Sequence, residues 1–289
     1  MIALVTDSNA QLPAELVERY GVEVVPLTVT VDGTEYLEGV DIDADAFYAR
    51  FQAGRPAVST AQPSPGRFAA AYEAVADRGA TEILSVHIGS SVSGTVNSAR
   101  LASQVSPVPV RIVDTGTASF AVSLCLWAGA DAVAAGATLE EAAAAAERAS
   151  ATVGNVCVVG ALDVARAGGR LAGDVSHTGA ATIPVLTLSG GVMQQVERCR
   201  DLEEAADVMT RFVQAAGSSL RVGVGLSDPG TLPLVAALED RLRAAPEVRE
   251  LVRYRIGPSV GAHTGPGTVG TMFAPTGLRA MGERFTPAS

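Results

Sequence analysis

The segment Glu82–Thr95 reads EILSVHIGSSVSGT, and it indicates the fold of the first half of the chain. Its first seven residues are mostly apolar and rich in isoleucine, leucine and valine, a pattern that favours a short buried strand. Glycine, serine and threonine follow, and a helical pattern begins near Thr95. In open α/β sheets, ligands bind beside the carboxyl ends of the strands. The segment therefore predicts a strand, a polar turn and a helix, with a candidate binding loop at the turn.

Similar units surround this segment. Strands are expected over 2–6, 22–31 and 108–115, and helices over 13–20, 43–52 and 64–79. In the last of these helices Ser64 is the expected N-cap, Pro65 stands in the first turn and Gly79 at the end. Alternation of strands and helices predicts a parallel sheet covered by helices on both faces.

The pattern changes after about residue 155. Two apolar runs around Gly190-Gly191 predict a hairpin over 184–200. Further strands are expected over 220–227, 248–257 and 269–275, and helices over 202–217 and 231–245. We therefore expect an α/β protein of two lobes. Residues 1–155 form a Rossmann-like α/β lobe with a parallel sheet, and residues 156–289 form a mixed or antiparallel α+β lobe.

Composition excludes several classes of function. All 21 basic residues are arginine, so mechanisms that need a lysine, such as a P-loop or a Schiff base, are excluded. The net charge is −10, which opposes binding to nucleic acid because phosphate must be neutralised by a basic surface. Hydrophobic residues make up 48% of the chain and aromatic residues only 4%, so the core must consist of alanine, valine and leucine.

Cysteine usage and the apolar runs indicate a cytoplasmic protein. Cys125, Cys157 and Cys199 are far apart, as expected of reduced thiols. The first ten residues lack the charged region and the long apolar run of a signal peptide. The alanine-rich stretch 118–146 is interrupted by Asp131, so it predicts packed helices and not a membrane span. We expect a monomer.

Three polar loops are candidate binding elements: STAQPSPG at 59–66, GSSVSGT at 89–95 and GAHTGPG at 261–267. The first two lead into helices, whose N-termini attract anions through free N–H groups and partial positive charge. Serine and threonine hydroxyls there can donate to an oxygen anion without a metal. For any one loop, simple helix capping explains the same residues. His263, in the third loop, is less easily explained by packing.

The remaining polar candidates favour structural roles. His87 lies in an apolar strand and is expected to be a buried, hydrogen-bonded core residue, whereas His177 is expected to be exposed. Asp41 and Asp43 lack a third ligand for a metal and are expected to begin a helix. We therefore expect no metal and no cofactor.

Five segments stand in order along nearly the whole chain: VTDSNAQLP (5–13), STAQPSPGRF (59–68), GSSVSGTVNSA (89–99), ARAGGRLAG (165–173) and GAHTGPGTVG (261–270). Together they resemble the motifs of the DegV family, the bacterial fatty-acid-binding proteins that have the EDD fold. The departures from the family pattern are Ala61 for serine, Gly89 and Val92 in the third segment, and Ala167 for lysine.

The resemblance implies a binding protein without catalytic activity of its own. A long-chain fatty acid would lie in an apolar tunnel between the lobes and would be the bound ligand. Its carboxylate would be held by the hydroxyls of Thr60 and Ser93 and by the backbone around Gly94. His263 would lie beside them and would polarise or hold the carboxylate.

The resemblance also implies a partner and a place in phospholipid metabolism. In family members that act as kinase substrates, a separate fatty acid kinase converts the bound acid into an acyl phosphate. Arginines implicated in docking the kinase match Arg170 and, less closely, Arg198 or Arg200 of this chain. A transient contact with a membrane surface is a further expectation.

Two other readings remain open on the sequence. Ser93 and His263 could form the pair of an acyl hydrolase, although no G-x-S-x-G elbow surrounds Ser93. A fold-level kinship with dihydroxyacetone kinase, in which a histidine holds a small ketone, is an analogy that leaves an apolar tunnel without a purpose.

Overall fold

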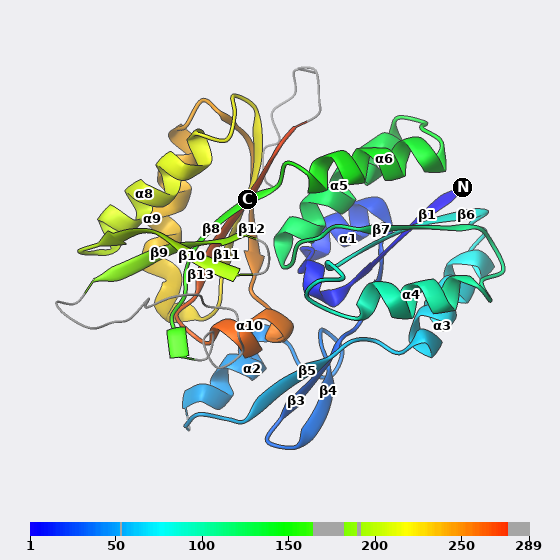
Figure 1. The fold of residues 1–289 in the computed structure, drawn as a ribbon, viewed down its shortest axis with the longest axis horizontal. Coiled ribbons are helices and arrows are strands. Elements are labelled where there is room, and N and C mark those ends of the chain that lie inside the picture. Colours follow the sequence, from blue (N-terminus) through cyan, green and yellow to red (C-terminus); the bar gives the residue numbers. More distant parts are fainter. Residues whose placement is uncertain (53, 164–181, 190–191, 277–289) are drawn as a thin grey trace.

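The computed structural model describes residues 1–52, 54–163, 182–189 and 192–276. Within these residues the strands form a four-stranded, a six-stranded and a three-stranded sheet. Figure 1 shows the four-stranded and six-stranded sheets side by side, with the three-stranded sheet below them.

The four-stranded sheet is entirely parallel, in the order β2-β1-β6-β7. Its strands are β1 (Ile2–Asp7), β2 (Glu23–Val25), β6 (Glu82–His87) and β7 (Val110–Asp114). Successive residues of β1 face opposite sides: Leu4 packs with α5 and α6, and Val5 with α3 and α4. Those helices are α3 (Pro65–Asp77), α4 (Thr95–Ser103), α5 (Phe120–Ala134) and α6 (Leu139–Ser150), and α1 (Ala14–Tyr20) follows β1. The predicted parallel sheet with helices on both faces is confirmed.

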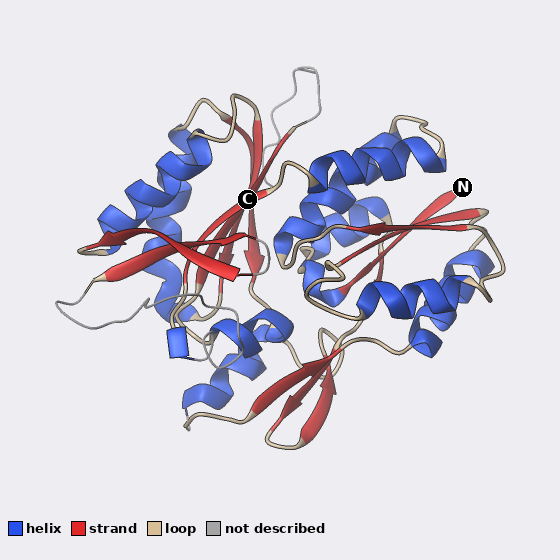
Figure 2. Ribbon diagram, viewed as in Figure 1, coloured by secondary structure: helices blue, strands red, loops and turns tan. Residues whose placement is uncertain are grey.

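The six-stranded sheet has the order β10-β9-β8-β13-β11-β12. Only the β11–β12 pair among them is parallel. The strands are β8 (Gly154–Val158), β9 (Ile183–Ser189), β10 (Val192–Cys199), β11 (Leu220–Leu226), β12 (Val248–Arg255) and β13 (Val269–Pro275). Helices α8 (Leu202–Gln214) and α9 (Leu232–Ala244) cover the outer face (Figure 2). The predicted hairpin and the mixed character of this half are confirmed.

The expected strand over 22–31 was wrong, because it is two strands of different sheets. β2 ends at Val25, Pro26 and Leu27 interrupt the pairing, and a new strand starts at Thr28. Proline has no N–H to donate to a ladder, so a strand ends readily at this position. The second strand opens an antiparallel sheet in the order β4-β3-β5, made of β3 (Thr28–Val31), β4 (Thr34–Leu37) and β5 (Val58–Ala61).

Two short helices connect this small sheet to the rest of the molecule. They are α2 (Ala44–Ala49) and α10 (Pro258–Thr264), and α10 contacts α2, β3 and β5. Three 3-10 turns complete the described elements: η1 (Ser8–Ala10), η2 (Arg50–Gln52) and η3 (Pro229–Thr231). The division of the chain at residues 155 and 156 stays a prediction. It would separate the small sheet from α10, against which that sheet packs.

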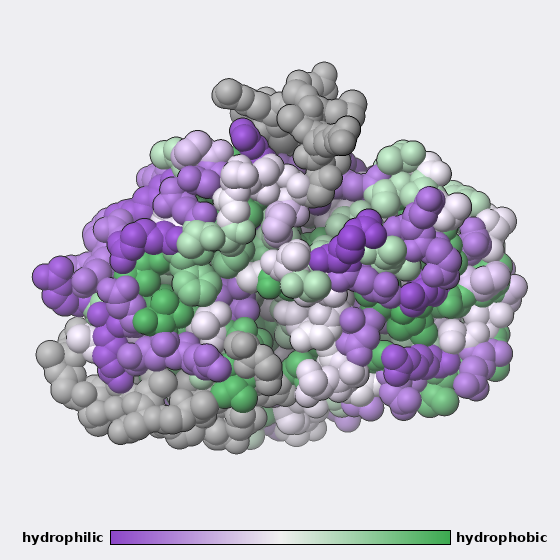
Figure 3. Space-filling model, turned by 45° about the horizontal axis from the view of Figure 1, so that its top comes forward, coloured by the Kyte–Doolittle hydropathy of each residue, from purple (hydrophilic) through white to green (hydrophobic). Residues whose placement is uncertain are grey.

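Apolar side chains are mostly enclosed. On the face shown in Figure 3, apolar residues form small patches between polar ones. Within the described part of the chain, no helix combines the length and apolar character that crossing a membrane requires. Among the described residues, the exposed large apolar side chains are Met1, Val40, Leu101, Val105, Leu202 and Leu232.

The two larger sheets meet where α5 touches β11. The Phe120 ring stacks on Tyr254 of β12, with ring centroids 4.5 Å apart. Both rings lie directly over glycines of β11: a Cβ built at Gly223 would be 2.3 Å from Phe120 Cδ1, and one at Gly225 would be 2.2 Å from Tyr254 Cζ. Glycine is therefore required for this close contact between ring and strand.

We expect Gly223→Ala to lower the free energy of unfolding by about 1–3 kcal/mol, because the added methyl group overpacks a buried contact. Urea unfolding followed by circular dichroism measures the change. Gly66→Ala is the control, since a Cβ there would meet only Ser64 Oγ at 3.8 Å. Equal stability of the two variants would contradict the assignment of a tight contact at Gly223.

Candidate ligand-binding site

A cavity of about 420 Å³ lies between the inner face of the six-stranded sheet and the carboxyl ends of the parallel strands. Thr60, Ser93, Gly94 and His263 all line it. The three polar loops singled out in the sequence therefore meet at one place, although they are far apart along the chain. Their role in binding stays a prediction.

Thr60 and His263 are brought together by the packing of α10 on the small sheet. Thr60 pairs with Val29 in β5 and β3, and α10 contacts both strands. Thr60 Oγ1 lies 3.2 Å from His263 Nε2. The expected loop around His263 was wrong, because residues 258–264 form α10. A Cβ at Gly261 would be 2.6 Å from the Tyr48 hydroxyl, so a glycine there lets α10 lie close to α2.

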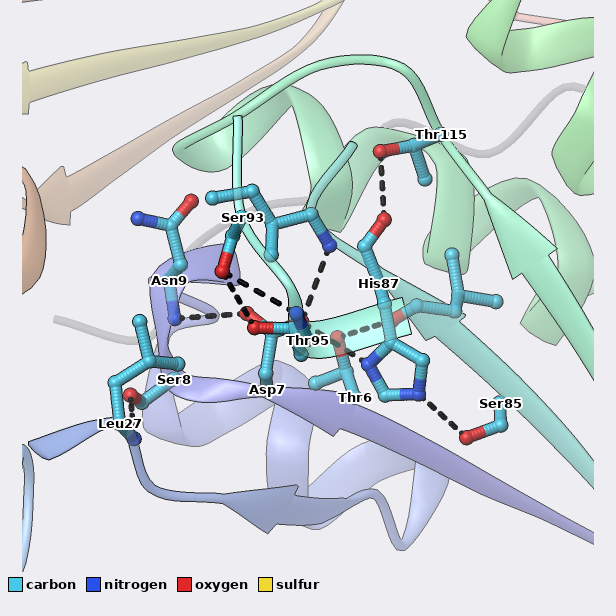
Figure 4. A network of polar contacts seen from close by, with 12 residues as sticks. Thr6, Asp7, Ser8, Asn9, Leu27, Ser85, His87, Ser93, Thr95 and Thr115 are labelled. Carbon is cyan, nitrogen blue, oxygen red and sulfur yellow. Dashed lines mark hydrogen bonds and ion pairs between the residues drawn. The ribbon is translucent and has the colours of Figure 1, made fainter. Parts of the chain in front are cut away.

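Ser93 lies in the turn that opens α4. Its Oγ is 2.8 Å from Thr95 Oγ1 and accepts a hydrogen bond from the Thr95 N–H at 3.3 Å (Figure 4). Gly94 is the N-cap residue of α4, and the Gln62 side chain packs against its Cα. The first and second polar loops thus touch each other at the start of a helix, where backbone N–H groups favour an anion.

A buried polar network lies beneath this turn. His87 Nδ1 is 3.0 Å from Asp7 Oδ2, and His87 Nε2 is 2.6 Å from Ser85 Oγ, which in turn contacts the Tyr72 hydroxyl at 2.9 Å. Both Asp7 and His87 are completely buried. Figure 4 shows the imidazole of His87 between Asp7 and Ser85. The prediction of a buried, hydrogen-bonded His87 is confirmed.

Asp7 also fixes the backbone at the cavity. Its carboxylate accepts hydrogen bonds from the N–H of Asn9 and from the N–H of Ile88, each at 3.1 Å. Asn9 and Ile88 line the cavity and follow β1 and β6, respectively. One buried carboxylate therefore holds together the ends of two neighbouring parallel strands.

Asn9, Ser119 and Ser259 are among the polar residues of the cavity wall that no pattern in the sequence indicated. Asn9 donates from Nδ2 to Ser259 Oγ at 3.2 Å, and its Oδ1 accepts from the N–H of Ser119 at 2.8 Å. All three residues line the cavity. Asn9 stands in the first family-like segment, but nothing in the sequence indicated its partners, which are 110 and 250 residues away.

The rest of the cavity wall is mainly apolar. Alternate residues of β8 and of β13 line the cavity, and Cys157 is among them. Burial raises the pKa of the Cys157 thiol to about 12, so this side chain stays neutral and behaves as an apolar residue. Other wall residues are Leu27, Ile88, Val92, Val159, Leu188 and Met193.

Of the arginines predicted to dock a partner, Arg198 and Arg200 do not line the cavity. Arg170 and His177 lie outside the described residues. Arg198 is on β10, and Arg200 follows that strand and forms an exposed ion pair with Glu204 at 3.0 Å. A docking role for these arginines stays a prediction.

No hydrogen bond joins Ser93 to His263 within the described residues. Ser93 Oγ makes its hydrogen bonds with Thr95, whereas His263 Nε2 meets Thr60 Oγ1. A general base must lie within hydrogen-bond reach of the nucleophile it activates. Within the described residues, no three or more histidine, cysteine, aspartate or glutamate side chains gather as metal ligands.

Comparison with known proteins identifies relatives over most of the chain. The model of the DegV family, described as uncharacterised proteins, matches residues 1–276. A DegV domain-containing protein of Streptomyces coelicolor is 36% identical over 276 residues, covering 94% of this chain and 98% of the relative.

Solved structures agree with this family match. A DegV family protein from Thermus thermophilus, described by its fatty acid binding, has a TM-score of 0.84 at 33% identity and covers 95% of this chain and 99% of its own. A DegV lipid-binding protein from Thermotoga maritima has a TM-score of 0.83 at 26% identity, with 94% and 98% coverage.

We expect Asp7→Ala to lower the free energy of unfolding by about 3 kcal/mol or more, because two buried N–H groups and an imidazole lose their acceptor. Asp7→Asn keeps one acceptor oxygen and should lose less. Urea unfolding measures both. The control is Asp240→Ala, whose side chain is 83% exposed and whose removal should change stability by less than about 0.5 kcal/mol. A loss for Asp7→Ala no larger than for this control would refute the holding role of Asp7.

Proposed function

The chain belongs to the DegV family, and on this premise we propose that it binds one long-chain fatty acid in the cavity and catalyses no reaction itself. The observation that supports the proposal is that the cavity wall has a polar part and an apolar part. Hydroxyl, amide and imidazole groups gather where the three polar loops meet, and apolar side chains form most of the remainder. A fatty acid has matching parts, a polar carboxylate and a long apolar tail.

The polar part suits a carboxylate. Thr60 and Ser93 would donate hydroxyl protons to its oxygens, and the backbone around Gly94 would add the favourable charge of the α4 N-terminus. His263, 3.2 Å from Thr60, would orient that hydroxyl or donate to the carboxylate itself. Hydrogen bonds to a charged group contribute about 1.5–3 kcal/mol each, so the head group chiefly determines how the ligand is oriented.

The apolar part would supply most of the affinity. A chain of ~16 carbons buries about 14 methylenes at roughly 0.8 kcal/mol each, or about 11 kcal/mol in total. Immobilising the ligand costs several kcal/mol. Micromolar binding needs about 8 kcal/mol, so the tail and the head group together are sufficient.

We further propose that the protein presents the bound acid to a separate fatty acid kinase in the cytoplasm, which converts it into an acyl phosphate. A structural neighbour described by its fatty acid binding supports this role, and an apolar ligand needs a protein that shields it from water. Arg170, Arg198 and Arg200 are the docking candidates, since arginine can pair with carboxylates of a partner at an exposed surface. A brief contact with a membrane surface would allow loading.

We expect Thr60→Val and Ser93→Ala each to weaken palmitate binding by about 10- to 100-fold while the fold persists, because each removes one hydrogen bond to a carboxylate. Isothermal titration calorimetry measures the affinity and circular dichroism the fold. Ser103→Ala, at the far end of α4, is the matched control and should bind like the unaltered protein.

Unchanged affinity in both variants would exclude this head-group site. Hydrolysis of short acyl esters that disappears in Ser93→Ala would favour the hydrolase instead.

We expect native mass spectrometry of the purified protein to reveal an excess equal to one fatty acid. Denaturing extraction should release that mass as a free acid, which also identifies its chain length. A ligand-free mass that does not change after incubation with palmitate would rule out the carrier function.

A further inference from the structure

We propose that Glu38 is the positioning residue of the head-group end of the cavity. It lies behind the cavity wall and would act through Ser259 and Asn9 rather than by touching a ligand. The proposal rests on the proposed function only in naming a fatty carboxylate as the group that the positioned residues receive.

Glu38 joins three parts of the chain that together form the polar end of the cavity. Glu38 follows β4 of the small sheet, and Thr60 is on β5 of the same sheet. Its Oε2 accepts from the Ser8 hydroxyl at 2.5 Å, and its Oε1 accepts from the N–H of Ser259 at 2.8 Å. Ser8 follows β1 and Ser259 lies in the first turn of α10.

The contacts of Glu38 continue to the cavity wall. Ser259 Oγ accepts from Asn9 Nδ2 at 3.2 Å, and both residues line the cavity. His263 stands four residues after Ser259 on α10, so the two lie on the same side of the helix, one turn apart. Glu38 therefore holds the start of the helix whose last turn places His263 against Thr60.

Ser8 strengthens this link. Its hydroxyl donates to Glu38 and accepts a hydrogen bond from the N–H of Leu27 at 2.9 Å. Leu27 lies between β2 and β3, at the point where the chain leaves the parallel sheet for the small sheet, and it lines the cavity. Through Ser8, Glu38 is thus connected to the segment that joins the parallel sheet to the small sheet.

A buried acid in this position is costly, because burial disfavours the charged carboxylate. Glu38 is only 6% exposed. Burial raises its pKa to about 7, although the hydrogen bonds from Ser259 and Ser8 oppose the shift. The acid is therefore more easily protonated in the folded protein than in the unfolded chain. Because its pKa is raised on folding, Glu38 contributes stability that is fully present below about pH 4.5 and is lost as the pH rises through about 7.

Charged and titratable groups surround Glu38 on every packed element. They are Asp7 at the end of β1, Asp41 and Asp43 before α2, Asp45 and Tyr48 on α2, Arg253, Tyr254 and Arg255 on β12, and His263 on α10.

Either charge state of Glu38 can keep its two hydrogen bonds. When protonated, Glu38 can still accept from Ser259 and can donate to Ser8 Oγ, since a hydroxyl oxygen has two lone pairs. Glu38→Gln offers the same donor and acceptor without charge. Glu38→Ala removes both bonds. The two variants therefore separate positioning from charge.

We expect Glu38→Ala to weaken palmitate binding at least about tenfold and Glu38→Gln to bind within about threefold of the unaltered protein at pH 7.5, measured by calorimetry. The second readout is the Cε1–H NMR signal of His263, assigned through His263→Gln and recorded without ligand. This signal should move in Glu38→Ala and stay in place in Glu38→Gln. Ser8→Ala, which leaves the carboxylate in place, should shift this signal in the same direction and weaken binding by about fivefold, which is beyond the range expected for Glu38→Gln. That variant carries the test if Glu38→Ala does not fold.

The control is Glu239→Ala, because Glu239 is also a buried glutamate, 4% exposed, but it pairs with Arg243 and Arg253 and does not line the cavity. It should lower the melting temperature and keep the affinity. In addition, Glu38→Gln should gain melting temperature over the unaltered protein as the pH rises from 6 to 8, since the charge that burial disfavours is absent.

Any of three results would overturn the inference. The first is that affinity and the His263 signal are both unchanged in a folded Glu38→Ala or in Ser8→Ala. The second is that Glu38→Gln loses as much affinity as Glu38→Ala, and the third is that Glu239→Ala loses as much affinity as Glu38→Ala. If the unaltered protein does not bind palmitate, the proposed function fails. The His263 signal in the ligand-free variants then decides the positioning role alone.

Discussion

The flat contact of two aromatic rings with β11 is the constraint on which the cavity depends. Gly223 and Gly225 carry no side chains, so Phe120 and Tyr254 can lie directly on the strand. Because α5 is anchored there, the parallel sheet stands at a defined distance from the six-stranded sheet. Tyr254 is also part of the cavity wall. The same stacked pair therefore joins the two halves and bounds the space between them.

The polar end of the cavity has two supporting layers. Asp7 and His87 hold the ends of the parallel strands from below, and Glu38 holds the start of α10 from the side. Both carboxylates are buried and neither lines the cavity. Buried polar groups of this kind are expensive unless fully hydrogen-bonded, and here their partners include backbone N–H groups at strand and helix ends. Under the proposed function, rigid support of this type would let a few hydroxyls bind one carboxylate without rearranging.

Local patterns in the sequence predicted much of this structure. Ser64 caps α3 as expected, and the parallel sheet, the hairpin of β9 and β10 and the first two polar loops follow from periodicity and turn chemistry. The break at Pro26 and the helix around His263 were missed, because both depend on packing against distant elements. Asn9, Ser259 and Glu38 gave no signal, since a glutamate before a predicted helix is ordinary until its partners are known.

The walls of the cavity come from opposite ends of the chain. The hydrogen bond between Thr60 and His263 spans 203 residues, and that between Asn9 and Ser259 spans 250. Contacts so distant in sequence form late and slow the folding of a domain. During synthesis the first half of the chain leaves the ribosome well before α10 exists, so the nascent protein has strand ends and polar turns but no enclosed cavity. Under the proposed function, capture of an apolar ligand would be restricted to chains whose translation has passed α10.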